Sequence, residues 1–198
     1  MRNGMGAFYF KTPRTIRMAE DFRDLTAFKK DSTILDFEVK GEPPSEYIIT
    51  YNGNSLIPLK AGGAKVGGPQ KVKLTLGPQY PVERPHIEWL TPIAHPNISG
   101  HSVCLGNYNS AWTPHFRLVD LVEILWDYAR MAILNAEGGY NRGSRDWDDM
   151  RRHFKFPVDP RPLRDKVFGN NEGSSILRPT GAEDEITFVD DDEGACER

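Results

Sequence analysis

The sequence predicts an α+β domain with the order helix, four strands, helix. Two amphipathic stretches at helical spacing lie on either side of several short segments that are rich in β-forming residues. The chain has 198 residues, which is about one domain and an extension, and a domain of this size can bury a core without disulfides or metals. A single α+β domain is therefore the starting expectation.

The first helix is predicted over residues 14 to 29. Its apolar side chains recur at helical spacing, with arginine and aspartate residues between them. These apolar residues are Met18, Phe22, Leu25 and Phe28. The segment is expected to be amphipathic, with one face on the core.

Four strands are expected to follow, the first three of them as a meander. Residues 35–39 alternate apolar and acidic side chains, and residues 47–51 are rich in β-branched and aromatic residues. In residues 72–76, apolar side chains alternate with lysine and threonine. Residues 85–90 are the fourth strand. The long connection 52–70 is expected to be a loop, because its two Gly-Gly pairs are turn formers.

The second long helix is predicted over residues 118–132, which carry a broad apolar face. A polar helix capped by Ser144 is expected over 144–154. From Pro157 the chain becomes rich in proline, glycine and acidic residues, with little to bury. We therefore expect a domain over 1–156 and a largely flexible extension over 157–198.

Composition excludes several classes of protein. The net charge is −3 and basic residues form no long stripe, which argues against a nucleic-acid binder. The chain shows no signal peptide and no apolar run long enough to cross a membrane, so no membrane partner is expected. With only two distant cysteines, a reduced, cytoplasmic protein is expected.

Cys104 is the candidate reactive residue. A free cysteine is often a small, inert, buried side chain. Here it follows a His95-Pro96-Asn97 turn, and polar residues follow it, while Gly100 and Gly106 lie on either side. This setting favours a reactive thiol in a shallow exposed groove that admits an extended peptide terminus.

Histidines near Cys104 raise two other possibilities. Four of them surround it in sequence: His86, His95, His101 and His115. A structural zinc site is disfavoured because the spacings are not short pairs and no second cysteine is nearby. A Cys-His hydrolase, in which imidazole activates the thiol, remains a less favoured alternative, with His153 as the single later histidine.

The order of motifs resembles the active-site region of the ubiquitin-conjugating enzymes. The matching motifs are Tyr80-Pro81, Pro85, His95-Pro96-Asn97, Cys104-Leu105 and Trp112-Thr113-Pro114. The resemblance covers about residues 14 to 135 and is strong from 80 to 114. A short gap between Asn97 and Cys104 and a different C-terminal part indicate a divergent member, as expected of a bacterial ubiquitination-like system.

The resemblance implies a ubiquitin-conjugating-enzyme-like fold with an N-terminal helix, a four-stranded antiparallel meander, an active-site loop and C-terminal helices. It implies a thioester carrier that accepts a ubiquitin-like protein from an activating enzyme on Cys104 and transfers it to an amine such as a target lysine. No metal or small cofactor is needed. The alternative is a non-catalytic binding module of the same fold, which the presence of Cys104 and Asn97 disfavours.

The resemblance also suggests roles for other residues. The Asn97 amide steadies the oxyanion of the transfer step or ties down its own loop, and the two roles can coexist. His95 gives structural support to the turn. Glu137 is a weak candidate for the acidic residue that orients the incoming lysine, with Asp146 as another.

The first helix is the expected contact for the activating enzyme in the resembling family. Its candidate exposed basic residues are Arg14, Arg17 and Arg23. Basic residues at the rim of an interface govern the association rate and its salt dependence. The need for a ligase is left open, as are the modifier and its targets.

Overall fold

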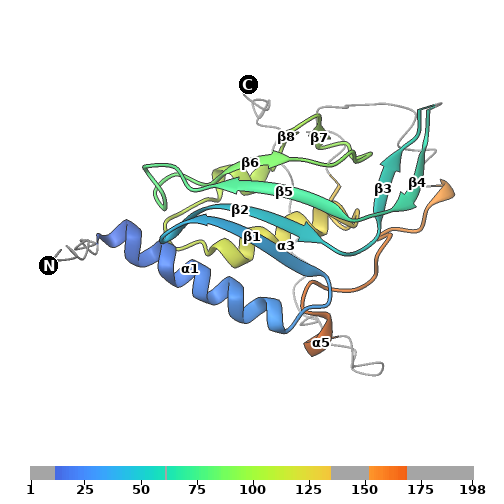
Figure 1. The fold of residues 1–198 in the computed structure, drawn as a ribbon. Helices are drawn as coiled ribbons and strands as arrows, with labels where there is room; N and C mark the ends of the chain where they lie inside the picture. Colours follow the sequence, from blue (N-terminus) through green and yellow to red (C-terminus); the bar gives the residue numbers. More distant parts are fainter. Residues whose placement is uncertain (1–11, 61, 135–151, 169–198) are drawn as a thin grey trace, which may run out of the picture.

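The structure is a computed structural model that describes residues 12–60, 62–134 and 152–168, and Figure 1 shows its α+β fold. Its helices are α1 (Pro13–Lys30), α2 (Asn107–Ser110), α3 (Leu118–Ala129) and α5 (Asp165–Phe168). Its strands are β1 (Leu35–Gly41), β2 (Pro44–Tyr51), β3 (Ser55–Pro58), β4 (Ala64–Gly67), β5 (Gln70–Thr75), β6 (His86–Trp89), β7 (Ile98–Ser99) and β8 (Ser102–Val103). No helix in the described ranges is long and apolar enough to cross a membrane.

The main sheet has four antiparallel strands in the order β1-β2-β5-β6, as the sequence predicted. The prediction of a loop over 52–70 was wrong, because β3 and β4 pair there as a hairpin from Ser55 opposite Gly67 to Pro58 opposite Ala64. Gly62 and Gly63 form its turn with φ of 91° and 78°, values that glycine adopts without strain. Four-residue strands next to glycines carry too little alternation to be seen in the sequence.

Helices α1 and α3 cover one face of the sheet. The alternate residues Tyr47, Ile49 and Tyr51 of β2 point toward them and are fully buried. The Tyr51 ring lies 5.6 Å from that of Trp126, and its hydroxyl donates to the Val122 carbonyl at 2.8 Å. Aromatic burial of this kind contributes much of a core's stability.

The opposite face of the sheet is polar. Lys73 of β5 lies 3.4 Å from a carboxylate oxygen of Glu46 on β2 and 3.3 Å from one of Glu88 on β6. These side chains are about one-third exposed, and exposed ion pairs contribute little stability. One buried and one solvated face is the usual arrangement for an antiparallel sheet.

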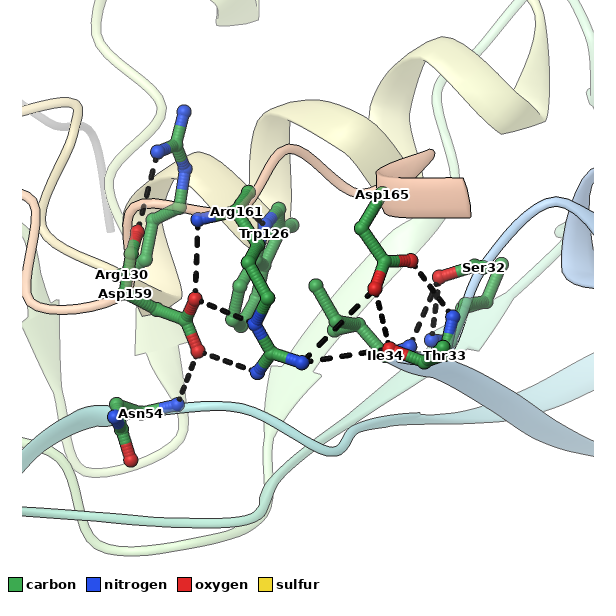
Figure 2. A network of polar contacts seen from close by, with 10 residues as sticks. Ser32, Thr33, Ile34, Asn54, Trp126, Arg130, Asp159, Arg161 and Asp165 are labelled. Carbon is green, nitrogen blue, oxygen red and sulfur yellow. Dashed lines mark hydrogen bonds and ion pairs between the residues drawn. The ribbon is translucent and has the colours of Figure 1, made fainter. Parts of the chain in front are cut away.

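Residues 154–168, which we call the strap, pack on the domain instead of leaving it. Leu163 is 3% exposed and belongs to the main core, and Asp159 is 1% exposed. Figure 2 shows the strap's polar contacts: the Arg161 guanidinium binds the Asp159 carboxylate at 2.7 and 2.9 Å, and Asp165 accepts from the Thr33 N–H at 2.7 Å. The domain therefore continues past the predicted boundary at 156.

Some sequence expectations fall largely outside the described residues. Of the helix predicted over 144–154, only 152–154 are described, and Arg152 and His153 are helical there. The flexible extension stays a prediction for residues 169–198. Composition misjudged the strap because the contacts of Asp159 and Leu163 are tertiary and leave no local pattern in a proline-rich segment.

Candidate active site around Cys104

The small β7–β8 hairpin brings Asn97 and Cys104 together. Ile98 pairs with Val103 and Ser99 with Ser102, so the next pair outward is Asn97 and Cys104. The Cys104 N–H donates to the Asn97 carbonyl at 2.8 Å, which continues the ladder. Directly opposed residues carry their side chains on the same face, about 5 Å apart at Cβ. The hairpin therefore brings the backbone of Asn97 next to that of Cys104.

The turn of this hairpin explains the short spacing between the two residues. Gly100 has φ of 57° in the turn between β7 and β8, and no atom lies within 4 Å of where its Cβ would be. The hairpin itself is held against β6, since Trp89 donates to the His101 carbonyl at 2.9 Å and His101 Nδ1 lies 2.7 Å from the Trp89 carbonyl. The tight turn fixes the ladder that carries the site.

Cys104 is covered rather than exposed. Its side chain is 3% exposed and Asn97 is fully buried, whereas the sequence suggested a shallow exposed groove.

His95 is fixed by main-chain contacts on both ring nitrogens. Its Nδ1 accepts the Asn97 N–H at 3.0 Å, and its Nε2 lies 3.1 Å from the Ile133 carbonyl. Because a carbonyl can only accept, Nε2 carries the hydrogen. Burial lowers the pKa of His95 to about 3, although the hydrogen bond to Ile133 opposes this. The imidazole is therefore neutral at physiological pH and occupied on both sides.

Tyr128 of α3 is a second support that the sequence did not single out. Its ring lies 5.3 Å from the His95 ring, and its hydroxyl donates to the Leu105 carbonyl at 3.2 Å. Burial, with a smaller contribution from Tyr108, raises the pKa of Tyr128 to about 12, so the hydroxyl keeps its hydrogen at physiological pH. One side chain thus touches the segments before and after Cys104. The signal available in the sequence was a tyrosine on the apolar face of a predicted helix.

The segment after Cys104 is tied to the turn before β6. The Trp112 indole N–H donates to the Pro81 carbonyl at 3.0 Å, and its ring lies 6.2 Å from that of Tyr80. An open cleft of about 500 Å³ lies between these segments. Its lining residues are Val82, Glu83, Arg84, Pro85, His86, Asn109 and Trp112. The Tyr-Pro and Trp-x-Pro motifs therefore pack together.

The basic face expected on α1 is mostly turned inward. Arg14 donates to the carbonyls of Leu76 and Gly77 at 3.0 to 3.1 Å. The Arg17 side chain is 12% exposed and binds Asp21 at 2.8 Å. Only Arg23 of the three arginines is well exposed, at 74% of its side chain. The expectation of exposed Arg14 and Arg17 was wrong, because backbone carbonyls distant in sequence accept hydrogen bonds from both side chains in the fold.

Two candidate acidic residues cannot be placed. Glu137 and Asp146 both lie outside the described residues. Within 12–60, 62–134 and 152–168, no group of three histidine, cysteine, aspartate or glutamate side chains is arranged to hold a metal ion. The acid that would orient an incoming amine stays a prediction.

Comparisons with known proteins agree with this geometry. The family model described as "Ubiquitin-conjugating enzyme" matches residues 50–154. Ubiquitin-conjugating enzyme E2 T of Xenopus laevis is 31% identical over 161 residues, which covers 69% of this chain and 83% of the relative. The Bos taurus protein of that name is 28% identical with the same coverage. The range 50–154 that the family model matches spans His95, Asn97 and Cys104.

A solved structure also has this fold. The structure of S. cerevisiae Ubc12 aligns with a TM-score of 0.52 at 19% identity, and the alignment covers 74% of this chain and 73% of that one. At this identity the likeness concerns the fold alone. The N-terminal helix, four-stranded sheet and later helices thus form a known architecture.

Proposed function

The chain belongs to the ubiquitin-conjugating enzyme family, whose members are transferases, and we propose that it carries a ubiquitin-like protein as a thioester on Cys104. The observation that supports this most is the β7–β8 register, which sets Cys104 opposite Asn97. A reacting sulfur and a hydrogen-bond donor on one face of a rigid hairpin suit acyl transfer.

The proposed reaction has two steps. First, the Cys104 thiolate attacks the C-terminal carbonyl of the modifier on an activating enzyme, a new S–C bond forms, and the thiolate of the activating enzyme leaves. Second, an amine such as a target lysine attacks the same carbonyl, a C–N bond forms, and Sγ of Cys104 leaves and is reprotonated. The attacking amine is neutral, and the proton that its nitrogen loses as the amide forms passes through solvent to the leaving sulfur.

In this proposal Asn97 acts during the second step. Its side-chain amide can donate to the oxyanion that forms when the amine attacks, and losing one such donor typically slows a reaction about a hundred- to a thousandfold. His95 supports this residue by accepting the Asn97 N–H. Its lowered pKa and its two occupied nitrogens argue against His95 as a base, and so against a Cys-His hydrolase that would use it.

The partners follow from the family and the surface. The activating enzyme and a substrate amine are needed, and of the arginines expected to contact the activating enzyme, Arg23 remains exposed. Arg23→Glu should slow charging at low salt and leave discharge to free lysine unchanged, because a rim charge acts on association. Charging rates that do not change across a salt series would remove α1 from the proposal.

The direct test is charging of the reduced protein with an activating enzyme, ATP and modifier. A conjugate should appear on a non-reducing gel and disappear with thiol. Cys104→Ser should give at most an ester that resists thiol, and Cys196→Ser should charge normally as the matched control. If Cys196→Ser alone abolished charging, the assignment to Cys104 would be wrong.

Asn97 is tested by separating the two steps. Asn97→Ala should slow discharge of the loaded protein to free lysine far more than it slows charging. Equal loss in both steps with a lower melting temperature would leave the residue with a loop role alone.

A further inference from the structure

Helix α3 ends on a strained residue. It is capped at Arg130, and the next residue, Met131, has φ of 65°, in the left-handed region that glycine usually occupies at this position. The Met131 N–H donates to the Tyr128 carbonyl at 3.1 Å, and the Ala132 N–H donates to the Asp127 carbonyl at 2.8 Å. These are the two hydrogen bonds of a Schellman motif, which ends a right-handed helix with one residue in the left-handed conformation. A residue other than glycine is disfavoured in this conformation. Contacts elsewhere in the fold must therefore stabilise Met131 in it.

The holding contact is a second, small core. The Met131 side chain is 1% exposed and is buried together with Leu56 of β3. Partly buried residues pack around this pair: Ala64, Ala94, Leu134, Phe154, Phe156 and Val158. The Val158 N–H also donates to the Arg130 carbonyl at 2.9 Å. The β3–β4 hairpin and the strap, both unforeseen from the sequence, therefore enclose the strained turn.

The turn delivers a backbone carbonyl to the candidate active site. Two residues after Met131, the Ile133 carbonyl accepts from His95 Nε2. That contact fixes the hydrogen on Nε2 and leaves Nδ1 free to accept the Asn97 N–H. Asn97 in turn pairs with Cys104 through its carbonyl. These contacts form one continuous series from the strap to the proposed nucleophile.

We infer that Met131 is a positioning residue for the transfer reaction, a role that rests on the function proposed for Cys104. Its buried side chain holds the left-handed turn, the turn sets the Ile133 carbonyl, and the carbonyl sets the tautomer and orientation of His95. Residues held in rare backbone conformations cluster at functional sites because the surrounding structure fixes them there. Without the anchor, the turn relaxes and His95 loses its Nε2 acceptor.

Three substitutions separate backbone conformation from side-chain burial. Met131→Ala removes the anchor but keeps the preference against left-handed φ. Met131→Gly removes the same anchor but adopts that φ freely. Met131→Leu keeps an apolar side chain of similar volume. Leu163→Ala is the matched control. Leu163 lies in the strap and is buried, as Met131 is, but its side chain belongs to the main core instead of the small one.

The first readout is the His95 ring in the uncharged, reduced protein, observed by nitrogen-15 correlation spectra. The wild type, Met131→Leu and Met131→Gly should show hydrogen on Nε2, whereas Met131→Ala should show a tautomer mixture. The second readout is single-turnover discharge to free lysine, at a temperature where each variant is folded. Met131→Ala should be slower by about tenfold or more, since small misplacements of reacting groups cost up to a hundredfold.

The inference and the proposed function fail in different ways. If wild-type protein forms no thioester, the function fails while the His95 spectra still test the turn. The inference is overturned if Met131→Ala leaves the His95 spectrum unchanged, or if Leu163→Ala disturbs it as much. If Met131→Ala does not fold, Val158→Ala is used in its place, because it removes a smaller, partly buried side chain from the same small core. It must then also give a His95 tautomer mixture and slower discharge to free lysine.

Discussion

The two ends of helix α3 are each held by a buried aspartate, but the surroundings of the two carboxylates differ. At the N-terminal end, Asp21 is fully buried and accepts from Arg17 at 2.8 Å, from the Tyr80 hydroxyl, and from the Leu118 N–H at 3.3 Å. These partners belong to α1, the turn before β6 and the first residue of α3. One carboxylate therefore joins three elements that are distant in sequence.

At the C-terminal end, the partners of Asp159 lie in the connection between β2 and β3 and in the strap itself. Asp159 accepts from the Asn54 N–H at 2.9 Å and from Arg161, two residues further along the strap, at 2.7 Å, as Figure 2 shows. The Arg161 side chain is 42% exposed, whereas the Arg17 side chain is 12% exposed. Breaking a buried ion pair costs much stability because the remaining charge is left in the interior without a partner. Breaking an exposed ion pair costs little because water solvates the remaining charge. The N-terminal end should therefore lose more when its aspartate is neutralised.

Two tryptophans report on the two ends separately. The Trp112 indole donates to Pro81, beside the Asp21 network, and the Trp126 indole donates to Arg161 at 3.0 Å, inside the strap. Each indole N–H gives its own signal in a nitrogen-15 correlation spectrum. A change at one end should shift one signal and leave the other in place.

The largest effect is expected from Asp21→Asn. It leaves Arg17 almost buried without its charged partner, and breaking a buried pair typically costs about 3 kcal/mol in the free energy of unfolding. Denaturant unfolding measures this loss, and the Trp112 signal should shift. Asp24→Asn is the control, because Asp24 is 34% exposed and should cost less than about 1 kcal/mol. Equal losses in the two variants would remove the special role of Asp21.

Gly53→Ala should act at the other end by steric conflict. An added Cβ would lie 2.3 Å from Cη2 of Trp126 and 2.8 Å from the Asp159 carboxylate. Forcing atoms into a packed site typically costs about 2 kcal/mol, and the Trp126 signal should shift while Trp112 stays. Gly77→Ala is the control, since no atom lies within 4 Å of its Cβ position. If the Gly53→Ala protein is as stable as wild type and its Trp126 indole signal does not shift, the strap does not pack against Gly53.

The smallest of the three effects is expected from Asp159→Asn, and it depends on pH. Burial alone would raise the pKa of Asp159, but hydrogen bonds from Arg161 and the Asn54 N–H outweigh it and lower the pKa below its usual value. The carboxylate thus contributes stability at pH above its unfolded pKa of about 3.9, and the contribution disappears as pH falls through the folded value.

At neutral pH, Asp159→Asn should therefore cost about 1.5 kcal/mol in the free energy of unfolding. The difference from wild type should be constant between about pH 7 and 5 and shrink below about pH 4. Unfolding curves at several pH values measure it. A difference that grows toward acid pH would contradict the lowered pKa.

The comparison also shows where sequence reasoning works. The amphipathic spacing of α1 and α3 and the alternation of the four main strands are local patterns, and the structure confirms them. The short hairpin between His95 and Cys104 is also local in the chain, but its pairing was not predicted, because two-residue strands carry no alternation.

What the sequence did not show depends on contacts between distant segments. The burial of Arg17 depends on the backbone carbonyls of Pro114 and Phe116, which are 97 and 99 positions away. The anchoring of the strap depends on Asp159 meeting Asn54, 105 positions away. The left-handed residue Met131 is not a glycine, so no residue type in the sequence marks this turn, and its side chain is buried in a cluster with the distant Leu56.

The central claim is that Cys104 carries the acyl group, and the most direct measurement locates that group on the charged protein. Reduced wild-type protein is charged, quenched in acid, digested at low pH and examined by mass spectrometry. The account predicts the modifier's C-terminal residue on the peptide that contains Cys104, with a mass that reverts when thiol is added. An acyl group found instead on a lysine or on the Cys196 peptide, with Cys104 unmodified, would contradict the account.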